Sequence, residues 1–200
     1  MSSKGPASKK KRPAVAAYTP QSLRRSAMNY VERYDCSTSG LIDVLKRKIY
    51  RSSRLHSIDV DELQATIPDI VEEFTEKNWI NDQRYAENLS RSLFRQGSSL
   101  QAIRFKLIEK GVANSLAEET IEALADESSL SKQDIDLAAA ISYAEKRRIG
   151  PFRLNDDAET FRDKDLGALA RRGFSFEIAE RVLSTDRKEL EEIIEEFKRL

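Results

Sequence analysis

The stretch WINDQRYAENLSRSLFRQGSSLQAIRFKLIEKGV, residues 79–112, gives the clearest indication of the fold class. Its apolar residues Leu100, Ile103 and Leu107 recur at three- and four-residue spacing, which is the period of an amphipathic helix. Gly111 follows a polar helix end, where a residue in the left-handed conformation would stop the helix. The stretch therefore predicts helices separated by short turns.

The same period continues outward from this stretch in both directions, and no alternating strand pattern interrupts it. We expect Asp82 to cap a helix, Tyr85 to face inward, and Arg84 and Arg91 to face elsewhere. Pro68 falls inside one predicted helix and is expected to kink or split it. The predicted helices cover residues 22–34, 38–55, 59–77, 82–96, 99–110, 115–125, 132–148, 158–172 and 175–184.

An internal repeat relates three parts of the chain. Tyr30, Tyr85 and Tyr143 are each followed by a small or β-branched residue and a glutamate, and Gly111 is echoed by Gly173. We predict equivalent places for the three tyrosines on the first helix of each repeat. The result is an all-α fold of three tandem three-helix repeats in an elongated, curved arrangement. Its predicted parts are a disordered basic arm (1–21), repeat 1 (22–78), repeat 2 (79–127), repeat 3 (128–185) and a charged helical extension (186–200).

Charge alternates with the same period, although the chain has 34 basic and 34 acidic residues and no net charge. Residues 24–54 carry eight basic and three acidic residues, whereas residues 56–88 carry two and nine. Stacked repeats would then present basic and acidic edges to a charged, elongated partner. The alternative is that opposite charges pair across neighbouring helices and leave only a solvated surface.

The composition argues against most kinds of chemistry. One cysteine, Cys36, and one histidine, His56, exclude disulfides and a zinc site of the Cys/His type. No glycine-rich phosphate loop and no HExxH or GxSxG motif occurs. We therefore expect no enzyme, no cofactor and no metal. With no apolar run long enough for a membrane span, we expect a cytoplasmic monomer without membrane contact.

Residues 79–112, with NDQRYA at 81–86 and the later Lys-Gly-Val, resemble the middle repeat of the RecX family, and LARRGFSF at 169–176 is similar to its third repeat. Asn81 stands where the family usually has an aspartate, and repeat 1 lacks the repeated glycine. The resemblance implies a non-enzymatic regulator of the RecA recombinase. Such a protein binds in the groove of the RecA–DNA filament and dampens ATP hydrolysis, strand exchange and repressor cleavage.

The alternatives are a stand-alone nucleic-acid-binding protein and a generic scaffold for protein partners. DNA, single-stranded or duplex, is a further candidate partner because basic residues on exposed helix faces neutralise phosphates. The candidate partner-binding residues are Lys46, Arg47, Lys48, Arg51, Arg84, Arg91, Arg104, Lys106, Lys110, Arg171 and Arg172.

Overall fold

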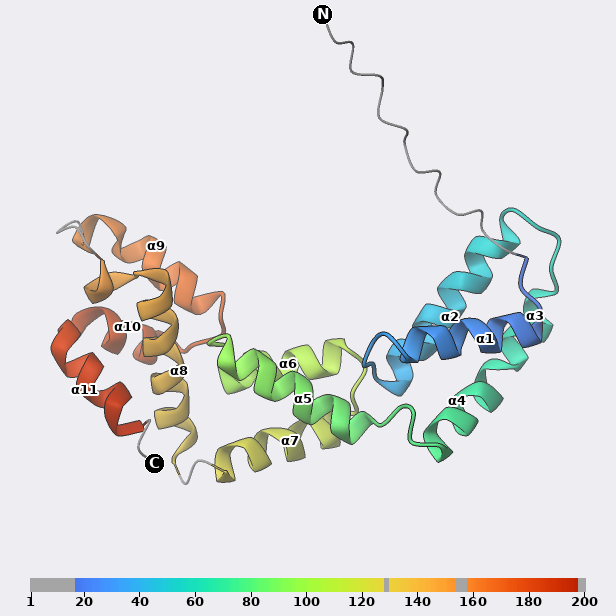
Figure 1. The fold of residues 1–200 in the computed structure, drawn as a ribbon. Coiled ribbons are helices and arrows are strands. Elements are labelled where there is room, and N and C mark those ends of the chain that lie inside the picture. The colour runs from blue at the N-terminus through green and yellow to red at the C-terminus, as the bar shows by residue number, and fades with distance from the viewer. Residues whose placement is uncertain (1–16, 128–129, 154–157, 198–200) are drawn as a thin grey trace, which may run out of the picture. The chain divides into compact units, whose positions relative to one another are not determined.

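The computed structural model describes residues 17–127, 130–153 and 158–197, and these residues form helices and turns without a strand (Figure 1). Most of the predicted basic arm lies outside the described residues. The α-helices are α1 (Pro20–Val31), α2 (Thr38–Ser53), α3 (Val60–Ala65), α4 (Ile67–Glu76), α5 (Asp82–Arg95), α6 (Leu100–Glu109), α7 (Asn114–Asp126), α8 (Lys132–Arg147), α9 (Ala158–Ala170), α10 (Phe176–Ser184) and α11 (Arg187–Phe197), with a 3-10 turn, η1 (Gly150–Phe152). The all-α prediction is confirmed.

The described chain divides into two compact bodies. The first contains residues up to 34 together with 41–79, and the second contains 35–40 together with 80 onward. In the first body, α2 buries Leu41, Leu45 and Ile49 along one side. The predicted helix at 59–77 is split into α3 and α4, and Pro68 lies in the first turn of α4. A proline is tolerated there because the first N–H groups of a helix have no partner within it.

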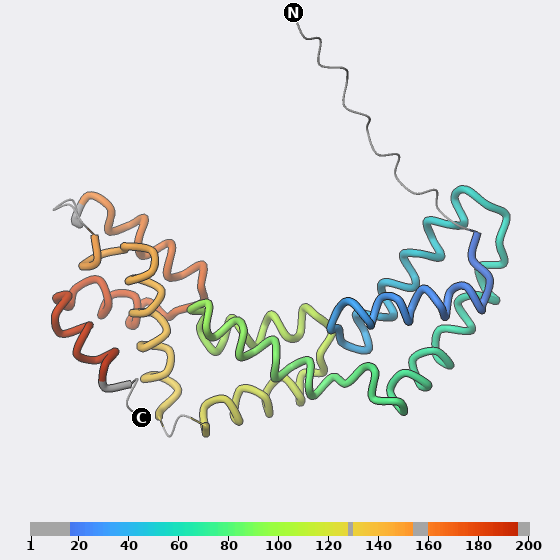
Figure 2. Tube along the Cα trace, viewed as in Figure 1, coloured from blue at the N-terminus to red at the C-terminus, as the bar shows by residue number. Residues whose placement is uncertain are grey.

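The second body holds two groups of helices, α5–α7 and α8–α11 (Figure 2). Each group has its own apolar core. Ala86 of α5, Ile103 and Leu107 of α6, and Ile121 of α7 belong to the first core. The second core joins α8, α9 and α10. The predicted C-terminal extension is α11, and it contributes the buried Leu190 and Ile194 to this second core. α11 is therefore packed as part of the body.

The cap predicted at Asp82 is wrong, although another aspartate does cap a helix. Asp59 caps α3, since its carboxylate accepts the N–H of Glu62 at 2.9 Å. Asp82 does not cap its own helix, because Asn81 accepts the N–H of Arg84 at the start of α5. The carboxylate of Asp82 accepts the N–H of Thr38 at 2.6 Å instead, so it caps α2, 44 residues earlier in the chain.

A compact joint surrounds this aspartate, where the end of α6 meets the start of α2 within the second body. The Ser37 hydroxyl donates to the carbonyl oxygen of Lys110 at 2.5 Å and accepts the N–H of Gly40 at 3.0 Å. Gly111 has a φ of +82°, and a Cβ built on it would lie 2.5 Å from the Cβ of Ser39. Only glycine fits both the backbone conformation and the space.

A second joint repeats the first, 62 residues further along, where the end of α9 meets the start of α6. The Ser99 N–H donates to the carbonyl oxygen of Arg172 at 3.2 Å. Asp136 of α8 accepts the N–H of Leu100 at 2.8 Å, as Asp82 accepts that of Thr38. Gly173 has a φ of +84°, and a Cβ on it would lie 2.5 Å from the Ser99 hydroxyl oxygen. Gly111 and Gly173, both identified from the sequence, therefore allow one repeat to pack closely against the start of the second helix of the preceding repeat.

The tyrosine register is the part of the predicted repeat that is wrong. Tyr30, Tyr85 and Tyr143 do lie on α1, α5 and α8, the first helix of each repeat. Tyr85, however, is in the first turn of α5, whereas Tyr30 and Tyr143 are near the ends of their helices. The residues that do correspond between repeats are Asp82 and Asp136. Each caps the second helix of the preceding repeat: Asp82 caps α2, and Asp136 caps α6.

Candidate binding surface

The basic side of α2 is the least compensated cationic surface among the predicted residues. Lys46, Arg47 and Arg51 are exposed, on the side of α2 opposite its buried leucines. The Arg47 Nε donates to the backbone carbonyl oxygen of Asp43 at 3.2 Å. Lys48 is half-buried and turns toward α1, where its Nζ donates to the Ser26 hydroxyl oxygen at 2.5 Å. No ion pair in the described structure uses Lys46, Arg47 or Arg51.

The cations of α6 are held differently, because acidic residues within the same repeat neutralise them. Arg104 is half-buried, and its Nε lies 2.6 Å from a Glu118 carboxylate oxygen of α7. Lys106 contacts Glu109 at 2.8 Å and lowers the pKa of that carboxyl below its ordinary value. Arg104 thus pairs with a neighbouring helix, as the alternative interpretation of the charge pattern expects, whereas Lys106 pairs within α6.

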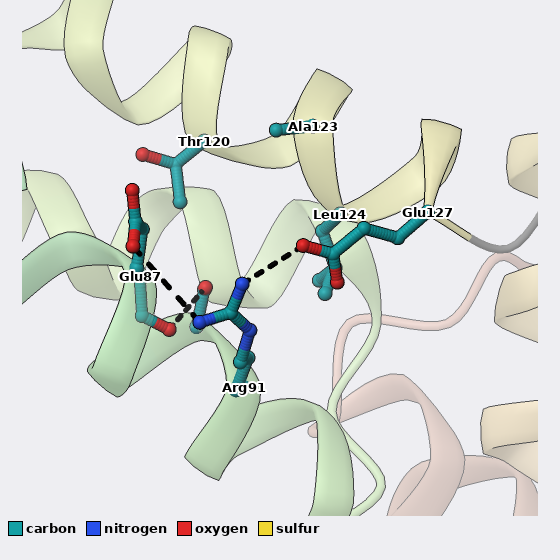
Figure 3. Close-up of a pocket in the computed structure, with 7 residues that line it drawn as sticks. Glu87, Arg91, Thr120, Ala123, Leu124 and Glu127 are labelled. Carbon is teal, nitrogen blue, oxygen red and sulfur yellow. Dashed lines mark hydrogen bonds and ion pairs between the residues drawn. The ribbon is translucent and has the colours of Figure 1, made fainter. Parts of the chain in front are cut away.

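Arg91 lies in a shallow pocket of about 50 Å³ between α5 and α7 (Figure 3). Its guanidinium points across the pocket to Glu127, with Nη2 2.8 Å from the carboxylate, and lies 3.9 Å from Glu87 of its own helix. The hydrogen bond with Glu127 raises the pKa of Arg91 above its ordinary value. The ion pair of Arg91 with Glu127 therefore joins α5 to the end of α7. Arg84, on the same helix, has an exposed side chain.

The cations at the two joints differ from one another. Lys110 and Arg171 are exposed, without an ion pair to any described residue. Arg172 is half-buried, with its guanidinium 4.9 Å from the centre of the Tyr143 ring and 3.4 Å from the Ser98 hydroxyl. Arg172 therefore holds the second joint, while Lys110 and Arg171 face solvent. Binding by any of the eleven residues stays a prediction.

Sequence reasoning missed Tyr50, whose side chain is 63% exposed beside Arg51 and Arg47. The signal that could have found it is its spacing: it is four residues after Lys46 and three after Arg47, so it shares their side of the helix. Arg54 is also exposed, in the turn that follows α2. Tyr50 thus adds an exposed aromatic ring to the basic side of α2.

Groups with other kinds of chemistry are few. Cys36 is buried two residues before the start of α2. Its burial, followed by the charges of Asp35 and Asp82, raises the pKa of its thiol to about 11. Such a thiol is protonated at neutral pH and is a poor nucleophile. No cluster of histidine, cysteine or carboxylate ligands suited to a metal ion occurs among the described residues. None of the described helices has the length and hydropathy that a membrane span requires.

Comparison with known proteins gives one consistent result. The family model described as "RecX, second three-helix domain" matches residues 81–121. "Regulatory protein RecX" of Myxococcus xanthus is 36% identical over 188 residues, which is 91% of this chain and 96% of that protein. The Agrobacterium fabrum protein of the same name is 38% identical over 115 residues, 58% of this chain and 57% of its own length.

A solved structure supports the fold. The crystal structure of RecX from Lactobacillus salivarius matches with a TM-score of 0.54 over 90% of this chain and 97% of that chain. At 21% sequence identity, this likeness concerns the arrangement of helices.

Proposed function

The chain belongs to the RecX family of regulatory proteins, and from that premise we propose that it is a negative regulator of the RecA recombinase. In this proposal it binds the filament of RecA on DNA and lowers the filament's ATPase, strand-exchange and coprotease activities. The observation that carries the proposal is the 36% identity to a regulatory protein across 91% of the chain.

The joints support a mechanism based on binding along a filament. A RecA filament presents the same surface once per subunit, so a partner benefits from repeats held in fixed register. Glycines at the two joints and the capping aspartates set that register in the second body. Several weak contacts in register give a strong total through their effective concentration. A regulator bound in this way would oppose the subunit movements that accompany ATP hydrolysis.

Exposed cations at the joints are the proposed contacts in the second body. Lys110 and Arg171 are exposed and form no ion pair with any described residue. They lie 61 residues apart, each just after the second helix of its repeat. An exposed charge contributes little to folding stability and is available for a partner. We expect them to contact acidic or phosphate groups of the filament.

The test is DNA-dependent ATP hydrolysis by the cognate RecA, titrated with this protein. The expected result is a fall in rate near one regulator per few RecA subunits, with strand exchange and repressor cleavage falling in parallel. The double substitution Lys110→Gln and Arg171→Gln should require more protein for the same effect. A matched control is Arg95→Gln with Arg181→Gln, two other exposed arginines of the second body. Unchanged ATPase at micromolar excess, together with binding to bare DNA, would favour the stand-alone nucleic-acid-binding alternative.

A further inference from the structure

We propose that one face of α2 is a binding platform for a single strand of nucleic acid. The platform consists of Lys46, Arg47, Tyr50 and Arg51, with Arg54 in the following turn. The cations would neutralise successive phosphates, and the Tyr50 ring would stack on a base. This direct contact with nucleic acid goes beyond the proposed regulation of RecA and does not depend on it.

The platform occupies one side of α2, opposite the buried side of the helix. Successive residues of an α-helix are about 100° apart around its axis. The platform therefore covers an arc of about 140° on α2, in the order Lys46, Tyr50, Arg47 and Arg51. Leu41, Leu45 and Ile49, which are buried, occupy the opposite side. From Lys46 to Arg54 the rise is about 12 Å, so the platform is long enough to follow a strand over more than one nucleotide.

The cations of the platform are not neutralised by acidic side chains of their own helix. α2 has a single acidic residue, Asp43, and that residue contacts Arg47 through its backbone carbonyl oxygen. The cations of α6, by contrast, are paired with carboxylates of their own repeat. A cation already paired inside the protein gains little from a phosphate, whereas an unpaired one releases the counterions of the nucleic acid. The platform is therefore the part of the predicted basic surface best suited to a polyanion.

The platform also contains an exposed aromatic ring. Tyr50 is 63% exposed, and no other ring or cation stacks on it among the described residues. Tyr34 is also exposed, but its ring lies 5.1 Å from that of Tyr30. An aromatic face between cations suits single strands, whose bases offer free π-faces, better than duplexes, whose bases are stacked.

The experiment measures binding of a fluorescent oligothymidylate and of a duplex of equal length by anisotropy, with the full chain and without RecA. The triple substitution Lys46→Gln, Arg47→Gln and Arg51→Gln should lower the slope of log affinity against log salt by about 2 and weaken binding up to about 100-fold at 0.1 M salt. Tyr50→Ala should weaken single-strand binding about five- to 150-fold, while Tyr50→Phe should retain it.

Matched controls remove equal charge elsewhere. Arg95→Gln, Arg148→Gln and Arg181→Gln also remove three exposed cations, from the second body, and should leave oligonucleotide binding close to that of the unaltered chain. Circular dichroism of every variant checks that the helices are retained, which is expected because the substituted side chains are exposed.

Two outcomes would overturn the proposal. If Tyr50→Ala binds the oligothymidylate as well as the unaltered chain, or if the duplex is preferred, no base stacks on this platform. If the α2 triple variant binds oligonucleotides normally but no longer affects RecA, the platform contacts an acidic protein surface. The second outcome would leave the proposed regulation of RecA intact, so the two proposals can fail separately.

Discussion

Replacing Gly111 by alanine tests the joint between α6 and the start of α2. A Cβ at this position would lie 2.5 Å from the Cβ and 2.6 Å from the hydroxyl oxygen of Ser39, and Ser39 is too short to move away without its backbone. The φ of +82° is a second cost, since an L-residue in the left-handed region loses about 1–2 kcal/mol. Overpacking of a fitted contact adds about 1–3 kcal/mol.

The two costs together predict that Gly111→Ala lowers the free energy of unfolding by about 2–5 kcal/mol, a large part of the ~5–15 kcal/mol of a typical domain. In thermal unfolding followed by circular dichroism, a loss of ~3 kcal/mol would lower the melting temperature by about 10 °C. Gly167→Ala is the matched control, because a Cβ there meets only the far end of the Arg171 side chain, at 3.3 Å. Alanine in that helix should be neutral or stabilise by up to about 1 kcal/mol.

A second substitution separates the two costs. Combining Gly111→Ala with Ser39→Gly removes the atoms that the new Cβ would meet and leaves the backbone strain. We expect the double variant to recover the packing share of the loss, measured as an interaction energy in a double-mutant cycle. The reasoning is refuted if Gly111→Ala melts within a degree or two of Gly167→Ala, or if Ser39→Gly recovers nothing.

Three further predictions concern polar groups that are buried or half-buried. Burial raises the pKa of Asp136 above its ordinary value, so ionisation of this group as pH rises costs stability. Asp136→Asn keeps an acceptor for the N–H of Leu100. At pH 7 this variant should have a higher urea midpoint of unfolding than the unaltered chain. At a pH below the ordinary pKa of aspartate, the two midpoints should be the same. With a pKa of about 11, Cys36 should react with a disulfide reagent at pH 8 far more slowly in the folded chain than in urea, and equal rates would contradict its burial. Asp165 is buried and holds Arg153 with two hydrogen bonds, so Asp165→Ala should cost about 3 kcal/mol in denaturant unfolding; a loss below 1 kcal/mol would show that the pair is not structural.

Local sequence patterns predicted the helices and the two repeated glycines, but not the register of the tyrosines. The apolar spacing placed most helix ends within two residues, because burial of one side decides where each helix runs. Gly111 and Gly173 were found because a left-handed helix end favours glycine whatever lies beside it. Their role in fitting one repeat against the next depends on Ser39 and Ser99, which are distant in sequence.

The tyrosine register and the basic surface show what local patterns miss. A short match around Tyr85 carried no information on its place along the helix, whereas Asp82 and Asp136 are related through partners 44 and 36 residues away. The basic residues were predicted as one set because sequence gives the number of cations and not their partners. Contacts between helices divide them, since Arg104 is paired with Glu118 and Lys46 is not paired with any described residue.

The two joints also give the repeats a direction. At each joint the carboxyl end of a second helix, with its partial negative charge, meets the amino end of the second helix of the preceding repeat, with its partial positive charge. Within the second body, the peptide dipoles of α9 and α6 therefore meet with opposite poles in contact, and the end of α6 meets the first turn of α2 in the same way. Because the two surfaces of the joint are different, it is a heterologous contact and not a self-complementary one. Such a contact can order repeats only head to tail, so the second body has two unlike ends and does not match itself when it is turned end for end.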